Sequence, residues 1–146
     1  MCRSYNVILF FEQSGFAYML SKDISPMRAI LVPLWVLIHL FMIDIANQSL
    51  SLDEDKLNKP WRPLPSGRIT ISTSTSISKA MNLICPLVSW FLGGRELLIL
   101  SIIFCGLSYS YNHLLLGDHY IWKNILNGFG YAVLEAGATT VLSDFF

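Results

Sequence analysis

Four polar side chains in the first half of the sequence are spaced as potential ligands of a metal ion. Asp44, Asn47, Ser51 and Asp55 follow one another at intervals of three, four and four residues, which places them on one face of a helix. Their side-chain oxygens are hard donors, and Mg²⁺ binds such donors together with substrate phosphates. The spacing therefore favours a Mg²⁺ site, and an acidic helix end that only meets water is the alternative.

A basic, proline-rich segment follows this row at residues 58–68, NKPWRPLPSGR. Its three prolines restrict the path of the backbone, and Gly67 permits a tight turn. Lys59, Arg62 and Arg68 offer charged donors of the kind that bind phosphate groups. Cations beside a row of acids suit a diphosphate bridged by a metal ion. A structural loop whose basic residues only set the membrane topology is the other interpretation.

The composition indicates what kind of protein must position these residues. The chain has 146 residues, of which 53% are hydrophobic and 14% are charged, and its mean hydropathy is +0.52. Soluble domains carry about 25% charged residues, so a soluble globular protein is excluded, and the apolar content excludes a disordered chain. The formal net charge of zero argues against a nucleic-acid partner. The expected class is one membrane domain, or a piece of one, in a lipid bilayer.

Long apolar runs supply the expected membrane spans. A helix needs about 20 mainly apolar residues to cross the hydrocarbon core. Runs close to this length lie at 27–47, 77–94, 95–117 and 123–143. Gly93–Gly94 forms a tight turn between the second and third runs, so these two are expected to be antiparallel. A further run at 7–20 is short and is interrupted by a glutamate. The predicted fold is an all-α, multi-pass transmembrane bundle of four to five spans.

The basic residues orient these spans. Cytosolic loops of membrane proteins carry an excess of lysine and arginine, and the connection 48–76 holds such an excess. We therefore expect 48–76 and 118–122 on the cytosolic side and the turn at Gly93–Gly94 on the other side. Lys22 and Arg28 would then lie on the non-cytosolic side, where this rule does not account for them. The Ser/Thr-rich stretch at 70–78 is interpreted as a solvated loop that leads into a helix.

The segment 47–69, NQSLSLDEDKLNKPWRPLPSGRI, resembles the first aspartate-rich motif of the UbiA-type intramembrane prenyltransferases, and is similar to a fungal branch of them. That motif reads N-D-x-x-D-x-x-x-D, followed by a basic residue and an R-P-[LI]-x-S-G-x-[IL] tail. Asn47 and Asp55 match the asparagine and the last aspartate, whereas Gln48 and Ser51 stand where the first and second aspartates are expected. The tail matches at Arg62, Pro63, Leu64, Ser66, Gly67 and Ile69.

The resemblance implies a fold of nine transmembrane helices around a polar cavity. Residues 1–146 would form a partial domain that resembles the N-terminal half of this fold. The implied activity is transfer of an isoprenoid chain from a prenyl diphosphate to an acceptor that the sequence does not identify. Mg²⁺ and cationic side chains would stabilise the departing diphosphate. The family's second acidic motif, after the sixth helix, is not found in this sequence, so we expect a truncated form.

The resemblance also assigns roles to individual positions. The residues expected to act in catalysis are Asn47, Asp55 and Arg62. Those expected to bind the diphosphate are Lys59, Arg62, Arg68, Asn112 and Lys123, of which the last two resemble the connection between the family's fourth and fifth helices. The expected Mg²⁺ ligands are Asp44, Asn47, Ser51 and Asp55.

Two other functions remain open from the sequence. Some UbiA-like proteins are terpene cyclases, which act on the prenyl diphosphate without an acceptor. The other possibility is a non-catalytic membrane protein that keeps a degenerate site. Gln48, Ser51 and the missing second motif favour this last interpretation.

Overall fold

The computed structural model describes residues 25–114 and 116–142. Its elements are α2 (Pro26–Leu50), α3 (Leu52–Asn58), α4 (Ile71–Asn112), the 3-10 helix η1 (Leu116–Asp118) and α5 (Tyr120–Leu142). Within these two ranges there is no β-strand, in agreement with the predicted all-α class. The short apolar run expected at 7–20 lies outside the described residues.

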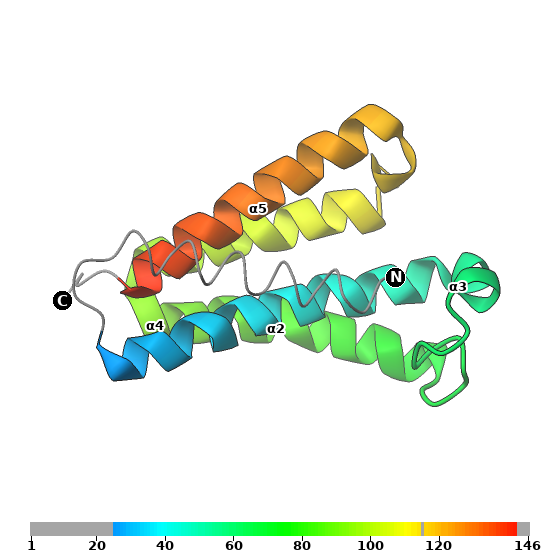
Figure 1. Cartoon of the computed structure of the whole chain (residues 1–146), viewed down its shortest axis with the longest axis horizontal. Coiled ribbons are helices and arrows are strands. Elements are labelled where there is room, and N and C mark those ends of the chain that lie inside the picture. Colours follow the sequence, from blue (N-terminus) through cyan, green and yellow to red (C-terminus); the bar gives the residue numbers. More distant parts are fainter. Residues whose placement is uncertain (1–24, 115, 143–146) are drawn as a thin grey trace.

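The 42 residues of α4 bend sharply near the middle, and the bend turns one long helix into a hairpin (Figure 1). Gly93 (φ −147°, ψ 22°) and Gly94 (φ 59°, ψ −145°) leave the helical conformation at this point. The conformation of Gly94 is one that only a residue without a Cβ atom adopts readily. We call residues 71–92 the first arm and residues 95–112 the second arm. They correspond to the second and third predicted spans, with the reversal at the predicted turn.

The first arm begins at Ile71, so the interpretation of the Ser/Thr-rich stretch as a solvated loop was wrong. Thr70 caps this helix, because its Oγ1 accepts a hydrogen bond from the backbone N–H of Thr73 at 3.1 Å. Ser74 is buried, and its hydroxyl shares a hydrogen bond of 2.6 Å with that of Ser49 on α2. Serine and threonine are weak helix formers on their own, and here the cap and the contact with α2 outweigh that preference.

The helix α2 packs against α4 and α5, and buried polar contacts join it to both arms. Trp35 Nε1 donates a hydrogen bond to Ser89 Oγ of the first arm at 2.9 Å. The two ring nitrogens of His39 contact the Trp35 carbonyl oxygen and Ser101 Oγ of the second arm, each at 2.8 Å. A carbonyl oxygen can only accept, so Nδ1 of His39 carries a proton. Buried polar groups require such partners, and these pairs therefore determine which parts of the arms meet α2.

The last helix, α5, is attached to α2 at two points. Gly137 of α5 is buried, and a Cβ atom at this position would collide with the indole ring of Trp35. Arg28, in the first turn of α2, donates from Nη1 to the backbone carbonyl of Leu142 at 3.2 Å. A cation is favourable at the C-terminal end of a helix. Arg28 thus has a structural role on the side where the positive-inside rule did not account for it.

Three of the described helices, α2, α4 and α5, are long and apolar enough to cross a membrane. Large apolar side chains on the two arms face outward, among them Leu83, Leu87, Phe91 and Ile102. Such an exposed apolar surface suits contact with lipid. Figure 1 shows the α2–α4 and α4–α5 connections at one end of the bundle, which we call the loop end, and the bend of α4 at the other.

Replacing Gly94 by alanine is expected to destabilise the protein by about 1–3 kcal/mol, because a side chain is strained at a φ of 59°. Gly106→Ala is the matched control, since Gly106 lies in the second arm and a Cβ atom there meets nothing within 4 Å. Thermal unfolding in detergent measures both variants. Equal midpoints would show that the reversal of α4 does not depend on Gly94.

Candidate functional site

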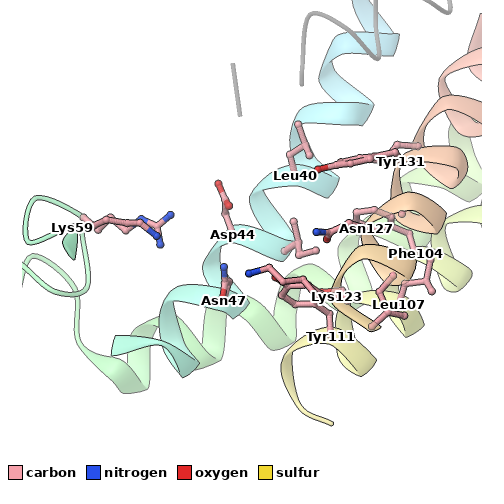
Figure 2. Close-up of a pocket in the computed structure, with 16 residues that line it drawn as sticks. Leu40, Asp44, Asn47, Lys59, Phe104, Leu107, Tyr111, Lys123, Asn127 and Tyr131 are labelled. Carbon is pink, nitrogen blue, oxygen red and sulfur yellow. The ribbon is translucent and has the colours of Figure 1, made fainter. Parts of the chain in front are cut away.

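A pocket of about 350 Å³ lies near the loop end of the bundle. Its walls are formed by α2, the second arm of α4, α5 and the segment that follows α3. Figure 2 shows side chains from these elements converging on the space between the helices. The pocket therefore exists only because the reversal of α4 brings its second arm and α5 back alongside α2.

The loop end of the pocket is polar. Asp44 and Asn47 line it from α2, Lys59 and Arg62 from the segment after α3, and Lys123 from α5. Figure 2 shows Lys59 pointing in from the loop and Lys123 reaching from α5 toward α2. Asp44 lies within the electrostatic reach of Lys59 and Arg62. Three cations beside one carboxylate make this end of the pocket attractive to an anion.

The lining becomes apolar with distance from the loop end. The lining residues farthest along each helix are Leu40 of α2, Phe104 of α4 and Leu134 of α5. Because an α-helix rises 1.5 Å per residue, the stretch of α5 from Lys123 to Leu134 covers about 16 Å. Phe104 is supported by an edge-on contact with the ring of His39, with 5.6 Å between the ring centroids. The pocket therefore has the polarity that an amphipathic ligand with an anionic head requires.

The segment 59–70 folds into turns that position its cations. The backbone N–H of Arg62 donates to the carbonyl of Lys59 at 3.1 Å. Gly67 has a φ of 75°, in the left-handed region that favours glycine. Leu64 is only 4% exposed, so the segment buries one of its own apolar side chains. The segment thus has a defined shape although it contains no regular secondary structure.

The carboxylate of Asp55, on α3, lies behind two of these cations. Asp55 is 1% exposed and is not among the residues that line the pocket. Its Oδ1 is 3.3 Å from Lys59 Nζ, and its Oδ2 is 2.5 Å from Arg62 Nη1. A buried carboxylate needs charged or hydrogen-bonding partners, and these two cations supply them. Lys59 and Arg62, which line the pocket, thus connect Asp55 to it.

Five of the residues that the sequence singled out meet in the pocket, namely Asp44, Asn47, Lys59, Arg62 and Lys123. Ser51 lies between α2 and α3 with φ −101° and ψ 28°. Its hydroxyl donates a hydrogen bond of 2.8 Å to the backbone carbonyl of Asn47. The predicted row of four oxygen ligands is thus divided between two helices, because the chain departs from helical geometry at Ser51.

Two other predicted residues, Arg68 and Asn112, lie outside the lining of the pocket. Arg68 donates to the backbone carbonyl of Trp61 and, at 2.9 Å, to Ser66 Oγ, so its contacts lie within the loop. Asn112 is 5% exposed and donates to the carbonyl of Ser108 at 3.0 Å. In this structure both residues stabilise segments that border the pocket.

Tyr111 and Asn127, which also resemble the family's connection between the fourth and fifth helices, line the pocket as well. Phe104 lines it too and was not among the candidates from the sequence. Phe104 lies in a nearly uniform apolar run. Nothing in that run distinguishes a side chain that faces the pocket from one that faces lipid, so only helix packing identifies Phe104.

The donors for a divalent cation in the pocket are the Asp44 carboxylate and the Asn47 amide. In the described part of the chain, no group of three or more His, Cys, Asp or Glu side chains could hold a metal ion. Mg²⁺ commonly binds one or two carboxylates and takes its other ligands from water and substrate phosphates. The donor set fits an ion that binds together with a phosphorylated ligand. Gln48 Oε1 is buried without a hydrogen-bond partner among the described residues, but Gln48 does not line the pocket.

Comparison with known proteins agrees with this geometry. Residues 8–146 match the UbiA prenyltransferase family, which is nearly the whole chain. The chain belongs to this family. The family inferred from the motif at 47–69 is therefore confirmed. UbiA-family members are integral membrane proteins, in agreement with the three helices of membrane-spanning length in the described ranges.

Individual UbiA relatives are similar over part of their length. The chain is 32% identical over 99 residues to somaliensene A/B synthase of Streptomyces somaliensis, covering 68% of this chain and 32% of the relative. It is 33% identical over 116 residues to fumagillin beta-trans-bergamotene synthase of Aspergillus fumigatus, covering 76% and 37%. It is 35% identical over 86 residues to digeranylgeranylglyceryl phosphate synthase of Sulfurisphaera tokodaii, covering 58% and 31%. The chain spans about a third of the length of these relatives. No solved structure matches it significantly.

Replacing Leu64 by alanine is expected to loosen the segment 59–70 and to lower the free energy of unfolding by about 2–5 kcal/mol. The reason is that the buried leucine loses its contacts and leaves a cavity. Leu57→Ala is the matched control, since Leu57 is 85% exposed. Thermal unfolding and limited proteolysis in detergent measure the effect. Equal protease sensitivity of the two variants would show that the shape of this segment does not depend on the buried Leu64 side chain.

Proposed function

We propose that this chain acts as a membrane prenyltransferase, which binds a prenyl diphosphate in the pocket and transfers the isoprenoid chain to an acceptor. The change from a charged to an apolar lining along the pocket is the main support for this proposal. Cations and a carboxylate lie at the loop end, and Leu40, Phe104 and Leu134 line the far end. This order matches a diphosphate head followed by an isoprenoid tail. The named function of a relative, digeranylgeranylglyceryl phosphate synthase, supports the same substrate class.

The proposal includes a multi-pass topology. In it, α2, the two arms of α4 and α5 each cross the bilayer. The basic segment after α3 then lies on the cytosolic side, where an excess of lysine and arginine is typical. A prenyl diphosphate would enter with its head at the membrane surface and its tail at membrane depth.

In the proposed reaction the cations bind the diphosphate. Arg62 offers a planar guanidinium that can contact two phosphate oxygens at once, whereas Lys59 and Lys123 act as point charges. Asp44 and Asn47 would hold Mg²⁺, which as a Lewis acid stabilises the charge of the leaving diphosphate. The cations are in place before the allylic C–O bond breaks, so they stabilise the developing negative charge without rearranging.

A terpene cyclase is the second candidate. Relatives of this chain include proteins named as terpene synthases. Phe104, Tyr111 and Tyr131 line the pocket, and aromatic rings stabilise a nearby cation through their π faces. This lining would serve a carbocation equally well with or without an acceptor.

The protein, purified in detergent, is expected to bind farnesyl or geranylgeranyl diphosphate in a Mg²⁺-dependent manner and to release inorganic diphosphate. Arg62→Gln is expected to weaken the binding about tenfold or more, because a hydrogen bond to a charged group contributes about 1.5–3 kcal/mol. Equilibrium binding with labelled prenyl diphosphates measures this change. Product analysis without an acceptor separates the two candidates, since a cyclised product formed under these conditions would favour the cyclase.

Lys56→Gln is the matched control for charge. Lys56 is half exposed and pairs with Asp53 at 3.1 Å on the outer face of α3, away from the pocket lining. The Lys56→Gln variant should bind prenyl diphosphate with the same affinity as the unmodified protein. Absence of Mg²⁺-dependent binding of both prenyl diphosphates would contradict the proposed function.

A further inference from the structure

The two acids expected to ligate Mg²⁺, Asp44 and Asp55, occupy different environments. Asp44 lines the pocket. Asp55 is 1% exposed, and each of its carboxylate oxygens contacts a different cation, Lys59 at 3.3 Å and Arg62 at 2.5 Å. Both of these cations line the pocket.

The backbone brings both cations to the same carboxylate. The N–H of Lys59 donates to the carbonyl of Asp55 at 2.7 Å, and the N–H of Arg62 donates to the carbonyl of Lys59 at 3.1 Å. Lys59 therefore follows Asp55 by one helical turn, and Arg62 follows by a further turn. Their side chains are only 29% and 13% exposed. Ion pairs shielded from water in this way are screened much less than surface pairs.

The carboxylate of Asp55 restricts the conformations of the Lys59 and Arg62 side chains. Lys59 and Arg62 carry like charges, and both are long, flexible side chains that lose conformational entropy when a ligand orders them. The carboxylate of Asp55 orders them when the protein folds. Two positive charges and one negative charge leave one net positive charge, and the charge of Lys123 on α5 balances that of Asp44 on α2. The cations thus remain attractive to an anion while they are held in position.

We propose that Asp55 is a positioning residue, which holds Lys59 and Arg62 ready for a diphosphate, and that the metal donors are Asp44 and Asn47. This inference rests on the proposed function. Direct ligation of a metal by Asp55 would require the carboxylate to release at least one of its buried partners. Leaving a buried charge without its partner is strongly destabilising. Asp44 and Asn47 already line the pocket, where a metal ion bound to the diphosphate would lie.

The test compares Asp55→Asn with Asp53→Asn. Both substitutions remove one negative charge from α3, but the side chain of Asp53 is 97% exposed. Mn²⁺ alone, followed by electron paramagnetic resonance, reports the metal donors. Inorganic pyrophosphate in the presence of EDTA, followed by calorimetry, reports the cations. Asp55→Asn is expected to lower pyrophosphate affinity about tenfold or more, because its cations lose their buried partner, and to change Mn²⁺ affinity far less than Asp44→Asn does. Asp44→Asn should instead lower the Mn²⁺ affinity and change the pyrophosphate affinity far less. Asp53→Asn should change neither affinity.

Two further measurements separate positioning from general stability. In the Asp55→Asn background, Arg62→Gln should lower pyrophosphate affinity little further, because Asp55 acts through Arg62 and the two effects are not additive. The ε-amino group of Lys59 should react faster with an amine-specific reagent in Asp55→Asn than in Asp53→Asn. If Asp55→Asn does not fold, Asp55→Glu takes its place. It keeps the charge but displaces the cations, so pyrophosphate affinity should fall while Mn²⁺ affinity remains.

A loss of Mn²⁺ affinity in the Asp55 variant as large as that in Asp44→Asn would overturn the inference, as would pyrophosphate binding equal to that of Asp53→Asn or additive effects with Arg62→Gln. Failure of the unmodified protein to bind pyrophosphate in EDTA, with binding restored by Mg²⁺, would also overturn it, because the cations alone would then not suffice. Failure to bind pyrophosphate and prenyl diphosphates with Mg²⁺ present would instead overturn the proposed function. The two failures are therefore distinguishable.

Discussion

The arrangement of the helices depends on buried polar contacts at one level of α2. Trp35 and His39, one helical turn apart, hydrogen-bond to Ser89 on the first arm and Ser101 on the second. In an apolar environment water cannot replace these bonds, so each one determines the rotation and the axial position of an arm against α2. The ring of His39 also packs against Phe104. The contacts that hold the bundle together therefore also set the deep boundary of the pocket.

At the loop end the constraint is charge balance. Asp55 is buried between two cations, which are thereby ordered in a segment without regular secondary structure. Lys59 belongs to this segment and Lys123 to α5, and both line the pocket. In the proposed function a diphosphate that contacts both lysines links the loop to the far wall of the pocket. Binding of the head group would then stabilise the geometry that binds it.

Much of the fold follows from local sequence. An apolar run long enough to span a membrane predicts a long helix, and the adjacent pair Gly93–Gly94 predicts the reversal within α4. Neither signal depends on contacts with another helix. Prediction failed where contacts between elements outweigh local preference. The stretch around Ser74 has weak helix propensity, yet it is helical because Thr70 caps it and Ser49 of α2 meets it. The row of four oxygen ligands predicted on one helix is divided because the backbone turns at Ser51. Helical spacing assumes a continuous helix, and a departure at one residue redirects every side chain that follows.

The sequence by itself determined that Asp44, Asn47 and Lys59 would lie near one end of an apolar bundle, because they are close along the chain and follow a span. It also determined the family, through a motif contained in one short segment. The family resemblance had already assigned Lys123 to the same site. Only the tertiary structure decided that Phe104 faces the pocket and that the carboxylate of Asp55 stays outside it. Such decisions depend on how each helix is rotated about its axis. That rotation is set by packing and hydrogen bonds between helices distant in sequence, which local residue patterns do not encode.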